Sequence, residues 1–378
     1  MNVGAIVFAT EKTDTLREIL FRPMIDTVIK AVKNADIRNI CVIAEENISQ
    51  IEKHFENSDI KVFTSVQEAT DAVGTDIIVF LRGNKPFIDS VSISGALAMH
   101  AKDGNDMTVI SEDSTAFCLS REAIGKAGIK TGIYASANKN INLSAETAED
   151  FINISETMRL SVLAGLIENG VSIPCTDGII IEADCKIGTG TTILPNTIIR
   201  GKTSIGEGCT IGPSSYIENA EIGSGVKFTS SHIRSAKIMN NADIGPFSHI
   251  RPDAIIGDNV HLGNFVEVKN SVIDTGTKVS HLTYVGDSDV GKNVNFGCGV
   301  VTVNFSGKTK SRTIIKDSAF IGCNTNLIAP VTVGKNSYTA AGSTITEDVP
   351  DNTLAIAREK QTNKEGWVKK NQPYRKKV

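Results

Sequence analysis

Large aliphatic residues recur at every sixth position in the second half of the chain. The first seven follow one another without a slip: Ile181, Ile187, Ile193, Ile199, Ile205, Ile211 and Ile217. The spacing then shortens by one residue in places, and the series continues at Ile222, Phe228, Ile233, Ile238, Ile244, Ile250, Ile256, Leu262, Val268, Ile273, Val279, Val285, Val290 and Phe296. After an interruption it returns at Ile315, Ile321, Leu327, Val333 and Ile345. Neither the 3.6-residue period of a helix nor the two-residue alternation of a strand produces this spacing.

A period of six predicts a parallel β-helix. It places one inward aliphatic on each side of a triangular coil, so three hexads close a rung and successive rungs stack as parallel sheets. Glycine often follows the aliphatic, as in Ile205-Gly206 and Leu262-Gly263, and suits a tight corner. The low aromatic content, 5%, fits a narrow prism without room for rings. We expect the β-helix over residues 173–350 and a C-terminal tail over 351–378.

One polar stretch, from Thr302 to Thr313, interrupts the repeat. It reads TVNFSGKTKSRT and carries Lys308, Lys310 and Arg312. On composition alone a solvated loop is as good an interpretation as a functional one. Long loops on rigid scaffolds do often carry function.

The front half alternates β-branched runs with helical stretches, which predicts an α/β domain with a parallel sheet covered by helices. A helix starting near Met24 should bury one apolar face. We expect this domain over residues 1–154 and a connecting helix within 155–172, which stops at Asn169-Gly170. The expected strands are Val3 to Ala9, Asn39 to Ala44, Lys61 to Ser65, Asp76 to Leu81 and Met107 to Ser111.

Charge and cysteine usage narrow the class of protein. A net charge of -4 argues against a nucleic-acid-binding surface, which is usually strongly basic. The N-terminus has no signal-peptide pattern and no apolar run of membrane-spanning length, so we expect a cytoplasmic protein with no membrane partner. The seven cysteines form no CxxC pair and no spacing typical of disulfides or zinc.

From Asp243 to Lys370 the chain resembles the acetyltransferase half of the bifunctional glucosamine-1-phosphate acetyltransferase and N-acetylglucosamine-1-phosphate uridyltransferase family. The match rests on IGPFSHIRP, HLGNFVEVK, SHLTYVGDSDVGKNVNFG, VNFSGKTKSRT, NLIAPVTVG, AAGSTITEDV and QTNKEGW. It extends beyond the repeat positions themselves. The resemblance implies a left-handed β-helix, a homotrimer with sites between adjacent prisms, and acetyl transfer from acetyl-CoA to the 2-amino group of glucosamine 1-phosphate, toward UDP-N-acetylglucosamine and the peptidoglycan of the cell wall.

The resemblance also assigns residues to the acceptor site. His281 falls on the family's general base, and an imidazole with a pKa of about 6.5 suits proton removal near neutrality. Arg251, Lys269 and Lys310 match the positions that grip the sugar and its phosphate, with Tyr284 as a hydrogen-bonding partner. Asn295 matches a sugar-contacting amide and Glu267 a carboxylate near the base. These last two could instead stabilise rung corners.

Acetyl-CoA, by the same resemblance, lies along the insertion loop. The matched positions are Cys298, Asn304, Phe305, Cys323, Ala341 and Arg358. Three of them depart from the family's usual residues: Phe305 replaces a tyrosine, Cys298 an alanine and Cys323 a serine. Phe305 keeps the ring and loses the hydroxyl, while Cys323 is a weaker donor than serine. No metal is required for this transfer.

The front half resembles the family's uridyltransferase domain more weakly, through AIVF, RPMIDTVIKAV, DIIVFLRGNKPFI and Asn153. The glycine-rich triphosphate loop with its arginine reads Thr10-Glu11-Lys12-Thr13-Asp14 here. The magnesium-binding aspartate falls on Asn84, which brings no charge to a metal. The stretch between Glu112 and Asn153 is shorter than the family's sugar and uracil pocket. We therefore expect a degenerate nucleotidyltransferase-like domain in which the uridyltransferase activity and its Mg²⁺ site are lost.

Other functions remain compatible with these residues. The front domain could cap the β-helix or dock a separate uridyltransferase. The acceptor could be another phosphorylated or nucleotide-linked amino sugar. The chain could also be a non-catalytic scaffold that keeps the fold around a decayed site.

Overall fold

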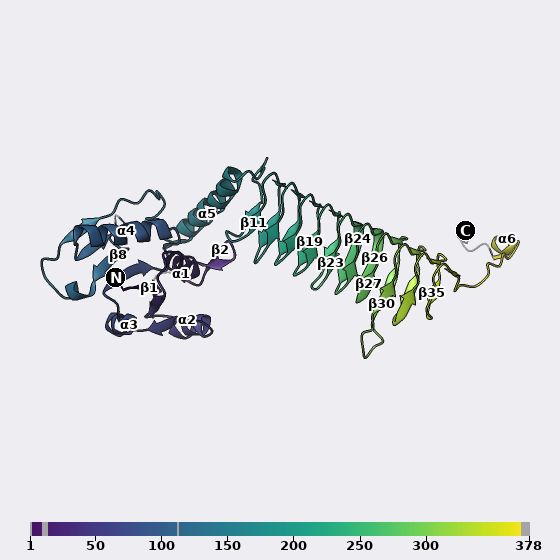
Figure 1. The fold of residues 1–378 in the computed structure, drawn as a ribbon, viewed down its shortest axis with the longest axis horizontal. Helices are drawn as coiled ribbons and strands as arrows, with labels where there is room; N and C mark the ends of the chain where they lie inside the picture. The colour runs from purple at the N-terminus through teal and green to yellow at the C-terminus, as the bar shows by residue number, and fades with distance from the viewer. Residues whose placement is uncertain (1, 10–13, 112, 372–378) are drawn as a thin grey trace, which may run out of the picture. The chain divides into compact units, whose positions relative to one another are not determined.

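The computed structural model describes residues 2–9, 14–111 and 113–371 of the 378-residue chain. Tertiary contacts divide it into two compact units, Met1–Ala164 and Gly165–Val378. The first is an α/β unit and the second a parallel β-helix (Figure 1). Among the residues described, no helix combines the length and apolarity needed to cross a lipid bilayer.

The front unit is built on a seven-stranded sheet with the order β5-β4-β1-β6-β8-β7-β9. Its strands are β1 (Val3–Ala9), β4 (Asn39–Ala44), β5 (Lys61–Phe63), β6 (Ile77–Arg82), β7 (Met107–Val109), β8 (Phe117–Ser120) and β9 (Thr131–Ile133). A small hairpin pairs β2 (Glu18–Ile19) with β3 (Arg22–Pro23). The helices are α1 (Met24–Asn34), α2 (Ile48–Phe55), α3 (Val66–Val73), α4 (Ser90–Asp103), the 3-10 turn η1 (Arg121–Ala123) and α5 (Ala148–Glu168).

The α/β rhythm is confirmed, but the sheet is mixed rather than purely parallel. Strands β5, β4, β1 and β6 run parallel, whereas β8 pairs antiparallel with both β6 and β7. The pattern missed β8 because Phe117, Cys118 and Leu119 form too short an apolar run to stand out from the turn before it. Helix α1 buries the expected apolar face, including Met24, Ile25 and Val28. Helix α5 begins at Ala148, earlier than the expected start near Ser155.

The β-helix consists of an 18-stranded and a 9-stranded parallel sheet. The larger contains β10 (Ile180–Ile181), β12 (Thr192–Ile193), β13 (Ile198–Arg200), β15 (Thr210–Ile211), β16 (Tyr216–Glu218), β18 (Lys227–Phe228), β19 (His232–Arg234), β21 (Asp243–Ile244), β22 (His249–Ile250), β24 (His261–Lys269), β26 (Lys278–Gly286), β28 (Asn295–Phe296), β29 (Val301–Val303), β31 (Phe320–Ile321), β32 (Asn326–Ile328), β34 (Tyr338–Thr339), β35 (Thr344–Ile345) and β36 (Leu354–Ala355). The smaller contains β11 (Lys186–Ile187), β14 (Ser204–Ile205), β17 (Glu221–Ile222), β20 (Lys237–Ile238), β23 (Ile255–Ile256), β25 (Val272–Ile273), β27 (Ser288–Val290), β30 (Thr313–Ile315) and β33 (Val331–Val333). The short helix α6 (Trp367–Asn371) follows.

The strand register explains the six-residue period. Ile181 pairs with Ile199 and Ile187 with Ile205, an offset of 18 residues, which is three hexads. Each inward aliphatic therefore stacks on its equivalent one rung later and excludes water from the prism. The period thus builds the β-helix, and the fold is the one that hexapeptide repeats of the left-handed type adopt.

Two aromatic rings nevertheless lie inside the prism. Phe228 is completely buried and Phe296 is 3% exposed. Phe228 stacks between Ile211 and Ile244, aliphatic residues of the neighbouring rungs. The expectation that the prism excludes aromatic rings was therefore too strict. A single ring fits inside the prism where the residues stacked on it from the rungs before and after are aliphatic.

The corner glycines are required by the close approach of rungs. A Cβ on Gly206 would lie 2.6 Å from the hydroxyl oxygen of Ser224, a residue of the next rung. A separate position in many corners has left-handed backbone, and asparagine adopts it at Asn196, Asn219 and Asn241. Asparagine tolerates this conformation better than most residues that carry a Cβ.

The interruption of the repeat is a loop between β29 and β30 that leaves the stack (Figure 1). We call residues 304–312 the insertion loop. Its two sides pair through an antiparallel bridge between Phe305 and Lys310, and the backbone N–H of Ser311 donates to the carbonyl of Asn304 at 2.9 Å. The stack resumes undisturbed, since Val290 pairs with Ile315 across the loop.

The stacked aliphatics should dominate the stability of the β-helix. Ile255 and Ile256 are neighbours on β23, yet Ile256 is completely buried and Ile255 is 37% exposed. We expect Ile256→Ala to lower the free energy of unfolding by about 2–5 kcal/mol, because it leaves a cavity between rungs. The control Ile255→Ala should cost about 0.5 kcal/mol. Urea denaturation followed by circular dichroism measures both, and equal losses would contradict the stacking account.

Candidate functional site

His281 lies at a corner of the β-helix, on the nine-residue strand β26, which pairs with the nine-residue strand β24. These strands pair in register, so Asn264 stands beside His281 and Glu267 beside Tyr284. The ring atom Nδ1 of the exposed His281 is 2.7 Å from Oδ1 of Asn264. An amide oxygen accepts, so this contact favours the neutral tautomer in which Nδ1 donates and Nε2 keeps its lone pair. Asn264 therefore fixes the orientation of the imidazole.

Several of the expected acceptor-site residues gather on the face that follows this corner. Arg251 Nη1 lies 2.7 Å from Oε1 of Glu267, and both side chains are partly exposed. Lys269 ends β24, and Tyr284 stands beside Glu267 on the next rung. We call Arg251, Lys269 and Lys310 the cation cluster. The carboxylate of Glu267 thus contacts a cation, whereas no contact between Glu267 and His281 is seen in the described part of the chain.

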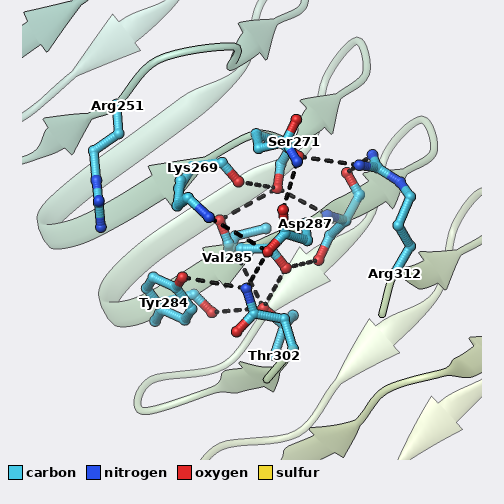
Figure 2. A network of polar contacts seen from close by, with 12 residues as sticks. Arg251, Lys269, Ser271, Tyr284, Val285, Asp287, Thr302 and Arg312 are labelled. Carbon is cyan, nitrogen blue, oxygen red and sulfur yellow. Dashed lines mark hydrogen bonds and ion pairs between the residues drawn. The ribbon is translucent and has the colours of Figure 1, made fainter. Parts of the chain in front are cut away.

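The insertion loop brings Lys310 to Lys269. A hydrogen-bonding contact with Lys269 lowers the pKa of Lys310, and the same contact raises the pKa of Lys269. The ammonium of Lys269 also lies 3.5 Å from the carboxylate of Asp287, and Figure 2 shows Lys269 pointing toward that carboxylate. Two basic side chains from distant parts of the sequence therefore meet beside one buried acid.

Arg312 fastens the far end of the insertion loop. Its guanidinium holds the carboxylate of Asp289 with two nitrogens, at 2.8 and 2.5 Å. It also donates to the backbone carbonyls of Asn270 and Ser288. This fork fixes the loop against the neighbouring rungs.

The residues expected for acetyl-CoA fall into two groups. Register places Cys298, Cys323 and Ala341 on equivalent corners of successive rungs, and backbone hydrogen bonds of 2.7 and 2.8 Å link their chain segments. Arg358 lies over the next residue, Gly342. The second group is on the insertion loop, where Phe305 is 56% exposed. Asn304 turns inward instead, and its amide donates to Asp287 and lies 3.5 Å from the hydroxyl of Tyr284.

One expected residue lies apart from the cation cluster, and several unexpected ones lie close to His281. Asn295 pairs with Lys278 on the preceding face. An exposed apolar column of Phe247, Phe265 and Leu282 flanks His281, with left-handed backbone at all three. The rings of Phe247 and Phe265 stack with centroids 5.5 Å apart. Bulky residues in this conformation cost energy and concentrate at functional sites. Sequence patterns did not reveal the column, because its members do not occupy inward positions.

A cavity of about 580 Å³ lies in the front unit, where β1, β4 and β6 end. Its lining includes the acids Glu45, Asp113 and Glu146 and a single arginine, Arg82. Asp14 is described and exposed, whereas Thr10 to Thr13 of the expected phosphate loop lie outside the described residues. The charged side chains that the structure describes in this lining are therefore mostly acidic.

Asn84 and Lys85 occupy the position expected for the metal site. Asn84 is 1% exposed and its amide nitrogen donates to the carbonyl of Ala145 at 3.4 Å, while its Oδ1 has no partner among the described residues. The next residue, Lys85, is buried and forms an ion pair with Asp113. Burial alone would raise the pKa of Asp113, but hydrogen bonds from Lys85, Thr115 and Ser111 hold it well below its usual range. A neutral amide beside a buried ammonium does not fit a divalent cation.

Comparisons with known proteins agree with this arrangement. Residues 178–219 and 235–270 match the bacterial transferase hexapeptide (six repeats) family. The bifunctional protein GlmU of Thermoanaerobacter pseudethanolicus is 36% identical over an aligned length of 424, which covers 93% of each chain. Because that length exceeds 378, the alignment includes stretches of the relative that have no counterpart here. GlmU of Clostridioides difficile is 48% identical over 65% of this chain and 54% of its own, and GlmU of a Geobacillus species is 54% identical over 56% and 46%.

Solved structures resemble parts of the chain. A 4-diphosphocytidyl-2C-methyl-D-erythritol synthase from Anaerococcus prevotii covers 41% of this chain and 97% of its own, with a TM-score of 0.33 and 14% identity. A UDP-N-acetylglucosamine acyltransferase from Francisella novicida covers 47% and 65%, with a TM-score of 0.30 and 19% identity.

The Lys85–Asp113 ion pair should stabilise the front unit. We expect Asp113→Ala to cost about 1–3 kcal/mol near pH 7, because it leaves a buried ammonium without its carboxylate. Since the pKa of Asp113 is depressed on folding, its contribution is present above the unfolded pKa of about 3.9 and is lost as the pH falls below it. The matched control Asp71→Ala breaks an exposed pair with Arg121 and should cost less than about 1 kcal/mol. Urea denaturation monitored by the helical circular dichroism signal tests this, and a pH-independent loss would contradict it.

Proposed function

The chain belongs to the bifunctional GlmU family and is an acetyltransferase, and from this premise we propose that it acetylates the 2-amino group of glucosamine 1-phosphate with acetyl-CoA. The observation that carries the proposal is the meeting of Lys269 and Lys310 on the face that adjoins the His281 corner. The product is N-acetylglucosamine 1-phosphate, an intermediate of UDP-N-acetylglucosamine synthesis.

The cation cluster supports a phosphorylated acceptor. Arg251 offers a planar fork for phosphate oxygens, and Lys269 and Lys310 add compact charges. Glu267 holds Arg251 at 2.7 Å, which leaves the other guanidinium nitrogens for a ligand. The hydroxyl of Tyr284 can donate to the sugar or its phosphate. A free amino sugar without phosphate would use none of these charges.

His281 supplies the base of the proposed reaction. The acceptor amine gives a proton to Nε2 while its nitrogen attacks the thioester carbonyl carbon. The carbon–sulfur bond then breaks, and the departing thiolate takes the proton back from the imidazolium, so that CoA leaves as a thiol. The hydrogen bond between Nδ1 and Asn264 stabilises the imidazolium in between.

Acetyl-CoA is proposed to lie along the edge formed by Cys298, Cys323 and Ala341. Backbone groups at such corners can bind the amides of the cofactor arm whatever the small side chain is, which accommodates both cysteines. Arg358 beside Gly342 provides a cation for the phosphates of CoA. Phe305, exposed on the insertion loop, offers a flat apolar face.

We also propose that the active form is a homotrimer. The exposed apolar column beside His281 is 55% to 59% exposed at Phe265, Leu282 and Phe247. Burying such a column against a neighbouring prism would close the site on its open side and remove apolar surface from water.

The front unit is proposed to have lost uridyltransfer. Acids dominate its cavity, and Asn84 and Lys85 do not fit Mg²⁺. The activated sugar would then be made by a separate uridyltransferase, for which the front unit could serve as a docking surface.

Acetyl transfer tests the proposal directly. With glucosamine 1-phosphate, we expect His281→Ala to lower kcat by about 100- to 10,000-fold through loss of the base. His232→Ala is the matched control, since His232 is another exposed β-helix histidine and should leave kcat unchanged. Product formation is followed by mass spectrometry. If the wild-type protein acetylates none of the amino sugars tried, the result supports a non-catalytic scaffold. If it acetylates another amino sugar faster than glucosamine 1-phosphate, that amino sugar is the acceptor.

Uridyltransfer provides a second test. We expect no pyrophosphate release from UTP and N-acetylglucosamine 1-phosphate with Mg²⁺, and none after Asn84→Asp, because Lys85 and the acidic lining remain. A GlmU relative that retains uridyltransfer serves as the positive control. Pyrophosphate release by the wild type would refute the loss.

A further inference from the structure

Asp287 is a buried acid next to the cation cluster that the proposed reaction does not use chemically. It follows β26, is 4% exposed, and has left-handed backbone with φ of 48°. Its backbone N–H donates to the carbonyl of Lys269 at 3.0 Å. Hydroxyls of the surrounding rungs accept from the backbone on either side of it: Thr302 from the N–H of Gly286 and Ser271 from the N–H of Ser288. Both hydroxyls lie close to Asp287 in Figure 2. The carboxylate therefore has a fixed place.

Three side chains, from two segments of the chain, donate to this carboxylate. Asn270 donates to Oδ1 at 2.5 Å, Asn304 of the insertion loop donates to Oδ2, and the ammonium of Lys269 lies 3.5 Å from Oδ2. Burial alone would raise the pKa of Asp287, but these hydrogen bonds and the charge of Lys269 lower it. Asp287 is thus an anion that accepts from every side.

The charge of Asp287 makes the meeting of the two lysines possible. Lys269 and Lys310 are in contact, and like charges at such separation repel. A carboxylate next to them offsets that repulsion, and its bond to Asn304 holds the start of the loop that delivers Lys310. One buried acid therefore links the phosphate-binding strand to the insertion loop.

We propose, resting on the function proposed above, that Asp287 is a positioning residue that sets the selectivity of the site for a phosphorylated acceptor. It does not touch the substrate. It holds Lys269 and the insertion loop so that both lysines face one anionic group. An amide at this position would turn an N–H₂ toward donors and remove the offsetting charge.

The selectivity between phosphorylated and unphosphorylated acceptors would not change if Asp287 had a purely structural role. We expect Asp287→Asn to raise the KM for glucosamine 1-phosphate by on the order of 10-fold or more, as loss of a supporting partner typically does. The slow turnover of unphosphorylated glucosamine should change little, because that acceptor carries no phosphate for the two lysines to bind. The matched control Asp317→Asn removes a corner carboxylate, bonded to the backbone of Lys292, and should leave the selectivity intact.

A second measurement does not depend on acetyl transfer. Hydrogen exchange of residues 304–312 should be faster in Asp287→Asn than in wild type, and binding of inorganic phosphate should be weaker. If Asp287→Asn fails to fold, the milder variant Asn270→Ala replaces it. Asn270→Ala should also speed the exchange of the insertion loop and weaken phosphate binding. If the wild-type protein does not acetylate glucosamine 1-phosphate, the proposed function fails. The role of Asp287 is still tested in that case, because loop exchange and phosphate binding do not require acetyl transfer. Unchanged exchange and phosphate binding, or equal losses on both acceptors, would overturn the positioning role.

Discussion

The stacking of one buried aliphatic per side of each rung is the constraint on which the rest of the β-helix depends. It sets the offset between neighbouring rungs, so residues about 18 positions apart become neighbours, as Ile181 and Ile199 do. Polar residues at outward positions inherit that alignment. Asn264 faces His281 because the aliphatics of β24 and β26 are stacked in register. The site is therefore a consequence of core packing, and a slip in the core would separate its members.

Opposite charges then decide what the aligned surfaces can bind. In the β-helix, two lysines and an arginine come together because the acids among them, Asp287 and Glu267, hold them in place. In the front unit the arrangement is reversed, since acids line the cavity and its buried ammonium is already paired with Asp113. The β-helix site therefore gathers cations, whereas most charged residues in the described lining of the front cavity are acidic. This contrast supports the proposal that the chain retains acetyl transfer and has lost uridyltransfer.

The sequence predicted the fold well and the site in part. The six-residue period located the inward positions, because burial follows a repeat that can be read directly. It missed strand β8, whose apolar run is too short, and it excluded rings that the prism accepts at Phe228. The partners of Asp287 lie 17 residues away on either side, at Asn270 and Asn304, so they become visible only when rungs are stacked. Outward polar contacts have no periodic signature, and they cannot be predicted without the register.

The central claim is that this site recognises an amino sugar through its anomeric phosphate. A competition experiment tests it most directly. The protein is incubated with isotopically labelled acetyl-CoA and equal amounts of glucosamine 1-phosphate, glucosamine 6-phosphate and glucosamine. The labelled products are then separated and identified by chromatography with mass spectrometry. The account predicts label on the 2-amino nitrogen of glucosamine 1-phosphate, well ahead of the other two. Equal labelling of all three acceptors, or preferential labelling of either of the others, would contradict it.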